Sequence, residues 1–159
     1  MLKEVLGIRE GILADLHNDH EEVSAMIEQI SASQDNKERG ALFKELMEKF
    51  FAHSKAEADI LYKKLEKSDS EESRKFALEG GVEHHVVENH FQEMARSRNK
   101  ESDKWTAQLT VLKELIQHHV KEEESTGFSN AHSQFDREQL VKMGEQFQRE
   151  KERLLSGAA

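Results

Sequence analysis

Two histidine–glutamate pairs stand out in this sequence of 159 residues, because both members of each pair could bind a metal ion. His53 precedes Glu57 by four residues, and His119 precedes Glu123 by the same interval. Residues four apart lie on one face of an α-helix, so each imidazole can converge with its carboxylate. Imidazole nitrogens and carboxylate oxygens suit iron, manganese or zinc. The pairs therefore indicate a metal site, provided that neighbouring helices supply further ligands.

The spacing of these pairs is a weak signal by itself, since most of the 32 acidic residues are glutamate. A histidine is followed four residues later by a glutamate in five places, which begin at His17, His53, His84, His118 and His119. Helical phase is more selective, because apolar residues recur in alternating steps of three and four along four long segments. Each segment places one histidine in that phase, and these histidines are His20, His53, His84 and His119.

Several neighbouring residues are out of phase with the apolar stripe. His85 and His118 lie one residue away from it, and Glu122 and Glu124 are directed toward its flanks or solvent. His17 and His85 each lie beside a candidate ligand or one turn from it, so they could still touch the site.

Glu57 and Glu123 continue the apolar stripe one turn after a histidine. A buried unpaired carboxylate is costly or is forced to take up a proton, so two of them in one core indicate a cation. Four imidazoles and two carboxylates exceed the needs of one tetrahedral zinc. They fit two ions, each bound by two histidines and both bridged by the glutamates. The alternative for any single histidine is a structural core residue that is hydrogen-bonded to a neighbour.

Four long helices must position these residues, and the composition favours them. The chain has no proline, 8 glycines, 35% charged and 36% hydrophobic residues, which suits amphipathic helices with solvated outer faces. The periodic apolar residues argue against disorder. We predict helices over about residues 2–33, 37–66, 70–98 and 100–124, followed by a shorter helix over about residues 136–155.

Glycines and capping residues indicate where these helices bend or end. Gly80-Gly81 predicts a kink or a close backbone approach in the third helix, or a break that divides it. Gly127 is expected in the loop after the fourth helix, and Asp136 to Gln139 resembles a capping box that opens the fifth. The fifth helix carries no in-phase histidine, and we expect it to cover the bundle or to form an oligomerisation surface, as in a homodimer.

These elements predict an all-α fold. We expect an up-down-up-down four-helix bundle over residues 1–128, with a C-terminal helical extension over residues 129–159 that packs on or extends from the same domain. A chain of this length can bury a substantial core. In such a bundle, the four in-phase histidines fall at a common depth.

Charge and composition narrow the classes of partner. The net charge of −9 argues against nucleic acid, since phosphate contacts need clustered lysine and arginine. The absence of cysteine excludes disulfides and thiolate metal sites. Acidic residues near the N-terminus and the lack of an apolar run of about 18 residues argue against a signal peptide and a membrane span. We therefore expect a cytoplasmic protein.

The histidine motifs resemble those of the hemerythrin-like, or HHE cation-binding, family over about residues 10–128. The matching motifs are Asp19-His20, His53-Ser-Lys-Ala-Glu57 with Tyr62 after it, Glu83-His84, and His119-Val-Lys-Glu-Glu123-Glu with Phe128 after it. The late segment Leu140-Val-Lys-Met-Gly144 is similar to the tail of many such proteins. The Glu-x-x-His pairs of ferritin-like di-iron bundles are absent, since no glutamate precedes a histidine by three residues.

The resemblance implies a four-helix bundle around a non-heme di-iron centre with an oxo or hydroxo bridge. Such a centre binds oxygen, peroxide, nitric oxide or a related small molecule at an open iron position, and manganese or zinc could substitute for iron. The family pattern assigns the terminal ligands as His20, His53, His84 and His119. It assigns Glu57 and Glu123 as the bridges.

The chain departs from the oxygen-carrying hemerythrins at two positions. Those proteins place a second histidine one turn after the third-helix ligand, where this chain has Glu88, and an aspartate five residues after the fourth-helix histidine, where it has Glu124. Loss of that histidine leaves Glu88, His17 or water to fill the position. It favours sensing, stress defence, peroxide turnover or iron handling over simple oxygen carriage.

Two alternative functions stay open. One is a di-iron enzyme that reduces peroxide or oxygen, with a catalase- or peroxidase-like activity for which no catalytic residue is assigned. Only Glu88 and the out-of-phase histidines offer a proton donor in the sequence. The other is a metal-free helical interaction module whose core histidines are structural and whose last helix binds a partner.

Overall fold

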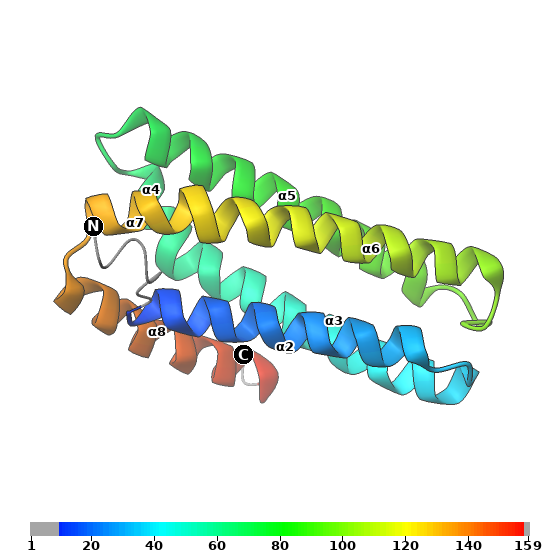
Figure 1. The fold of residues 1–159 in the computed structure, drawn as a ribbon. Coiled ribbons are helices and arrows are strands. Elements are labelled where there is room, and N and C mark those ends of the chain that lie inside the picture. The colour runs from blue at the N-terminus through cyan, green and yellow to red at the C-terminus, as the bar shows by residue number, and fades with distance from the viewer. Residues whose placement is uncertain (1–9, 158–159) are drawn as a thin grey trace.

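The computed structural model describes residues 10–157, and every regular element within that range is helical (Figure 1). The elements are α2 (Ile12–Ala32), α3 (Asn36–Glu57), η1 (Ala58–Tyr62), α4 (Lys63–Glu66), α5 (Glu71–Ala95), α6 (Asp103–Glu122), η2 (Glu123–Gly127), α7 (Phe128–Gln134) and α8 (Arg137–Leu155), where η1 and η2 are π-helical. The long helices contact one another in the order α2–α3, α3–α5, α5–α6 and α6–α2, and α8 lies against α2 and α3 (Figure 1).

The first long helix begins later than predicted. Gly11 has φ 56°, outside the right-handed helical region, and α2 starts at Ile12. A β-carbon at Gly11 would lie 2.1 Å from the carbonyl oxygen of Leu140, so only glycine permits this close approach of α8. A continuous helix through residue 11 is therefore wrong, and residues 2–9 of the predicted helix lie outside the described residues.

The second predicted helix is confirmed as one uninterrupted helical run. Asp35 caps α3 by accepting a hydrogen bond from the backbone N–H of Lys37, and α3, η1 and α4 follow one another without a gap to Glu66. The π-helical segment η1 begins directly after Glu57. Such segments widen a helix by one residue per turn and are frequent at functional sites.

Gly80 lies within one continuous helix, because α5 runs from Glu71 to Ala95 without interruption. The predicted break is therefore wrong, whereas the predicted close approach is confirmed. A β-carbon at Gly80 would stand 2.7 Å from both the Cζ and the hydroxyl oxygen of Tyr62. Gly81 has no such neighbour within 4 Å.

Gly127 does not end the fourth helix, which corrects the prediction of a loop. The helical path continues from α6 through η2 into α7 and ends at Gln134. A β-carbon at Gly127 would lie 2.3 Å from Cζ of Phe76 on α5, so this glycine serves close packing. The π-helical segment η2 begins at Glu123 itself, so a π-helical segment accompanies each of the two in-phase glutamates.

Helix α8 covers one side of the long helices. Asp136 and Gln139 form the predicted capping box at its start. Its buried residues Leu140, Met143 and Phe147 belong to the same apolar cluster as Leu13 and Leu16 of α2. The apolar face of α8 is thus used within the chain, as the covering role predicts.

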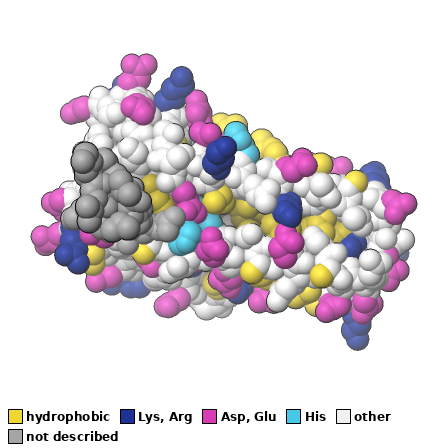
Figure 2. Space-filling model, in the orientation of Figure 1, with side chains coloured by type: hydrophobic (Ala, Val, Ile, Leu, Met, Phe, Trp, Pro, Cys, Tyr) yellow, Lys and Arg dark blue, Asp and Glu magenta, His cyan; other side chains and the backbone are white. Residues whose placement is uncertain are grey.

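The core consists of two apolar clusters. One includes Leu16 and Ala56, and the other includes Val23 and Phe50. Since His20 and His53 fall between these residues along α2 and α3, the polar layer separates the two clusters. On the surface, charged side chains of both signs are interspersed, and apolar side chains show between α2 and α6 (Figure 2). Within residues 10–157, no helix is long and apolar enough to cross a membrane.

Candidate metal centre

The six candidate ligands predicted from helical phase converge in the interior. Nitrogen or oxygen atoms of one group lie within 4.8 Å of one another, and this group is Glu57, His84, His119 and Glu123. The same limit holds for a second group, which is His20, His53 and Glu123. All six residues are buried, and Glu57 and Glu123 have no exposed surface. Both groups could hold a metal ion, and they share Glu123.

Each carboxylate lies between two histidines that come from different helices. Oε1 of Glu57 is 3.6 Å from Nε2 of His53 and 3.2 Å from Nε2 of His84. Oε1 of Glu123 is 3.2 Å from Nε2 of His20, and its Oε2 is 3.5 Å from Nε2 of His119. The Nε2 atoms of His84 and His119 are 2.9 Å apart. The donor atoms of all four rings therefore face the two carboxylates.

Several of these inward-facing atoms have no hydrogen-bond partner within residues 10–157. They are Nε2 of His20, both carboxylate oxygens of Glu57 and Oε1 of Glu123. The 3.2 Å approach of His20 to Glu123 is an ion-pair contact without hydrogen-bond geometry. Buried polar atoms without a partner are rare and costly, and a cation would satisfy all four. The donor set therefore fits a metal ion.

The two carboxylates differ in proton affinity when no metal neutralises them. Burial, followed by the negative charge of Glu123, holds the pKa of Glu57 well above its usual range. Burial also acts to raise the pKa of Glu123, but the nearby His119 and His20 outweigh it and hold that pKa well below its usual range. A proton on Glu57 thus relieves the electrostatic repulsion between the two buried carboxylates.

The pKa values of two of the histidines are shifted in opposite directions. Burial acts to lower the pKa of His20, but its contacts with Glu123 and Glu124 outweigh burial and raise the pKa to about 9. Burial, followed by the charge of His119, lowers the pKa of His84 well below its usual value. His84 is therefore neutral, the form in which an imidazole binds a metal.

The sequence decides which family this arrangement belongs to. A family model described as Hemerythrin HHE cation binding domain matches residues 11–131. The chain is a member of the hemerythrin family. Comparison with curated proteins and with solved structures finds no match. The matched segment contains all six candidate ligands of this hemerythrin domain and ends before α8.

A shell of carboxylates orients the histidines of this hemerythrin domain. Nδ1 of His20 lies 2.8 Å from Oε2 of Glu124, whose Oε1 is 2.8 Å from Nδ1 of His17. Such contacts leave Nε2 directed at the two carboxylates and raise the basicity of the ring. Helical phase directed Glu124 toward the flank, yet η2 brings it back against α2.

Two further histidines have the same kind of partner. Nδ1 of His53 lies 2.8 Å from Oδ2 of Asp19, and Nδ1 of His119 lies 3.0 Å from Oε1 of Glu83. Helical phase did not select either acid, because both lie one residue off the stripe. Their position directly before His20 and His84 in the family motifs was the available signal.

Tyr62 is a further residue that helical phase did not select. Its hydroxyl donates a hydrogen bond to Oε2 of Glu123, and its ring stacks on His84 with centroids 5.4 Å apart. Burial, followed by the charge of Glu123, holds the pKa of Tyr62 well above its usual value, so the hydroxyl keeps its proton. Tyr62 therefore fixes the orientation of one carboxylate.

The remaining candidates lie outside the two metal-binding groups. Glu88 accepts a hydrogen bond from the hydroxyl of Ser54 at 2.7 Å and belongs to neither group. His85 is exposed, and so is the side chain of His118, at 67%. His17 contacts the site through Glu124, as described above.

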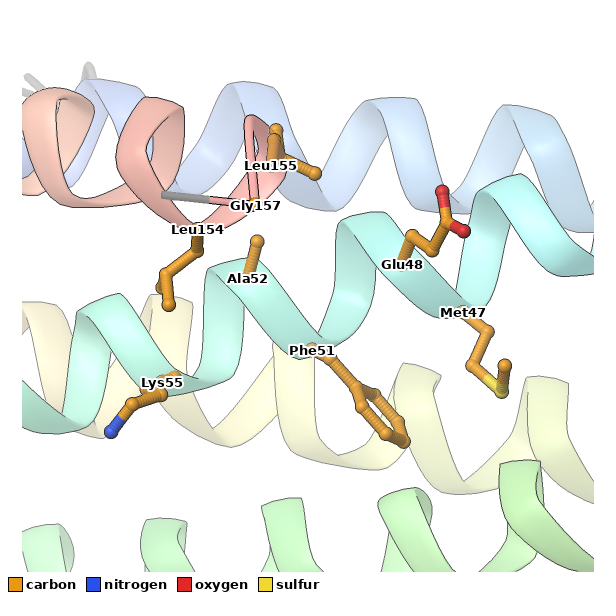
Figure 3. Close-up of a pocket in the computed structure, with 8 residues that line it drawn as sticks. All are labelled: Met47, Glu48, Phe51, Ala52, Lys55, Leu154, Leu155 and Gly157. Carbon is orange, nitrogen blue, oxygen red and sulfur yellow. The ribbon is translucent and has the colours of Figure 1, made fainter. Parts of the chain in front are cut away.

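Hollows of different size adjoin the helices within residues 10–157. The smaller, about 190 Å³, lies between α2 and α6 and is lined by His20 together with Ile27, Ile116 and Val120. The larger, about 420 Å³, lies between α3 and the end of α8, where Phe51, Ala52 and Leu154 line it (Figure 3). Only the smaller hollow is lined by one of the six candidate ligands, among the residues that the structure describes.

Proposed function

We propose that this hemerythrin domain is a non-heme di-iron protein that binds oxygen, peroxide, nitric oxide or a related small molecule, in sensing, stress defence or iron handling. The observation that carries the proposal is the pair of buried carboxylates, Glu57 and Glu123, each in contact with two histidines from different helices. Their partnerless oxygens call for cations. When bound, two bridged irons would supply redox chemistry and an open coordination position.

The roles of the residues follow from their contacts. His20 and His53 would hold one ion, and His84 and His119 would hold the other. Glu57 and Glu123 would bridge them, since each approaches one histidine of either pair. Manganese or zinc could occupy the same ligands.

The arrangement of helices supports this reading. We propose an up-down-up-down bundle over residues 1–128, with residues 129–159 as an extension of the same domain. The closed ring of contacts among α2, α3, α5 and α6 and the packing of α8 on two of them are consistent with that division.

A small ligand would reach the site most directly from the hollow between α2 and α6. Its lining combines His20 and aliphatic side chains with polar and charged ones. The aliphatic residues are Ile27, Ile116 and Val120, and the polar or charged residues are Glu21, Ser24, Lys113, Gln117 and Lys121. The volume of this hollow, about 190 Å³, suits a small ligand better than a large one. The buried core of the same helices is apolar and includes Leu16, Phe50, Val87, Phe91 and Ile116.

Metal analysis combined with absorption spectroscopy tests the proposal. Protein produced with ample iron should contain two irons per chain and show oxo-to-iron charge-transfer bands, which oxygen, peroxide or nitric oxide should change. A chain with one metal or none under these conditions contradicts the di-iron function.

A peroxide- or oxygen-reducing enzyme is the second candidate. Tyr62 favours it, because its hydroxyl lies inside the site and donates a hydrogen bond to Oε2 of Glu123. The expected result is catalase-like or peroxidase-like turnover by the iron-loaded protein that disappears in Glu57→Ala. Turnover that survives this substitution argues against catalysis at the centre.

A further inference from the structure

Helix α8 reaches the candidate metal centre through a chain of polar contacts. Nζ of Lys151 donates to Oδ1 of Asp19 at 2.6 Å, and the other oxygen of Asp19 lies 2.8 Å from Nδ1 of His53. The side chains of Lys151, Asp19 and His53 are only 15%, 12% and 4% exposed. Because solvent screens such contacts weakly, the lysine charge acts strongly on Asp19.

The ring of Phe147 packs against both His53 and the ammonium group of Lys151. It packs edge-on against His53, with ring centroids 5.8 Å apart and an interplanar angle of 87°. Nζ of Lys151 lies 5.1 Å from the centroid of Phe147 on the same helix. One turn of α8 therefore contacts His53 directly through Phe147. Through Lys151, the same turn also binds Asp19, the carboxylate that orients His53.

The outer carboxylates differ in what faces them. Glu124 contacts His17, and Glu83 lies 3.4 Å from Nε2 of His118. Asp19 contacts the ammonium group of Lys151. The contact belongs to a helix beyond the segment that matches the family, which ends at residue 131.

We propose that Lys151 is a positioning residue for His53 that also sets the electron density at the His20–His53 metal position. The inference rests on the proposed di-iron function. Lys151 fixes Asp19 in the orientation that accepts a hydrogen bond from Nδ1 of His53. Its positive charge also weakens Asp19 as the acceptor of that hydrogen bond. The ring is then a weaker electron donor to its metal than it would be without α8.

The sign of the effect follows from two contributions that agree. Removing a positive charge near a metal favours its more oxidised state and lowers its reduction potential. Freeing Asp19 from Lys151 strengthens its hold on the His53 proton, which makes the ring a better donor and lowers the potential further. Asp19→Asn removes a negative charge and should raise the potential.

The test compares reduction potentials of iron-loaded full-length variants. Lys151→Met should lower the potential, whereas Lys151→Arg, which keeps the charge and the donor, should stay near the wild type. Lys142→Met is the matched control, since Lys142 is an exposed lysine of the same helix. Iron content and helical circular dichroism establish that each variant is folded and loaded. Lys151→Gln replaces Lys151→Met if the methionine variant does not fold.

A double-mutant cycle with Asp19→Asn distinguishes an effect of Lys151 that is transmitted through Asp19 from a long-range effect of the lysine charge on the metal. Asp19→Asn alone should lower the affinity for iron, measured by competition with a chelator, about 10- to 100-fold. In that background, Lys151→Met should shift the potential much less than in the wild type. An equal shift in both backgrounds overturns the proposal, and so does a Lys151→Met potential equal to that of Lys142→Met.

These outcomes are distinct from failure of the proposed function. A wild-type chain that holds no iron overturns both the function and the role of Lys151. A wild-type chain with two irons and no response to Lys151→Met overturns the role of Lys151 alone.

Discussion

Gly80 and Tyr62 lie so close together that a β-carbon at Gly80 would stand 2.7 Å from the tyrosine hydroxyl oxygen. This contact holds the ring of Tyr62 between α5 and the candidate metal centre, where it stacks on His84 and hydrogen-bonds to Glu123. A glycine in the middle of a helix is normally costly. Its cost here is offset by the space that it leaves for a buried tyrosine.

Gly80→Ala should therefore destabilise the protein. Overpacking costs about 1–3 kcal/mol and outweighs the helix propensity gained, which is about 1 kcal/mol. Gly81→Ala is the matched control, since a β-carbon there meets nothing within 4 Å and should stabilise the helix. Urea unfolding of both variants measures the two changes. Equal stabilisation by the two alanines contradicts a tight contact at Gly80.

Replacement of a candidate ligand should remove metal. His53→Ala and His119→Ala each delete one of the two histidines that we propose for an ion position, so iron per chain should fall below that of the wild type. His118→Ala is the control, because His118 neighbours His119 but points to solvent. Iron analysis after exhaustive dialysis makes the comparison. If the histidines are only structural, the substitutions change unfolding free energy by about 1 kcal/mol and leave any bound metal in place.

Glu57→Gln should have opposite effects on the metal-free and the metal-loaded protein. In the metal-free chain, the raised pKa of Glu57 means that the folded state holds a proton that the unfolded state has lost. Wild-type stability should then fall as pH rises above about 4.5, by at most about 1.4 kcal/mol per pH unit, and Gln removes this loss. The metal-loaded variant should be less stable than the loaded wild type, because it lacks one of the two carboxylates that we propose as bridges.

Thermal unfolding with and without a chelator, between pH 5 and pH 8, tests this reversal. Glu88→Gln serves as the control, since Glu88 belongs to neither metal-binding group. A Glu57→Gln variant that is less stable than the wild type in both states would show that the carboxylate is stabilising without metal.

Gly144→Ala should weaken the packing of α8 against α2. A β-carbon at Gly144 would lie 2.8 Å from the backbone nitrogen of Ile12 and 2.8 Å from Oδ2 of Asp15. The helix must shift, at a cost of about 1–3 kcal/mol. Amide hydrogen exchange should show faster exchange in α8 and the start of α2 than in α5. Unchanged exchange at both helices contradicts the close packing.

The candidate ligands could be predicted from the sequence because helical periodicity is a local property. Steps of three and four chose His84 over His85 and His119 over His118, and the structure directs the chosen rings inward and the others to solvent. The ends of the helices were harder to predict from the sequence. Gly11 and Gly127 are placed by contacts with Leu140 and Phe76, which are distant in the sequence.

Periodicity thus determined which face of each helix is buried and that this face carries four imidazoles and two carboxylates. Only the tertiary structure decided which side chains surround them. Asp19, Glu124 and Lys151 are polar residues off the apolar stripe, and their roles depend on which helices pack together and on the π-helical turn at Glu123. A side chain's partner on another helix is set by the relative rotation and depth of both helices, which no pattern along one of them records.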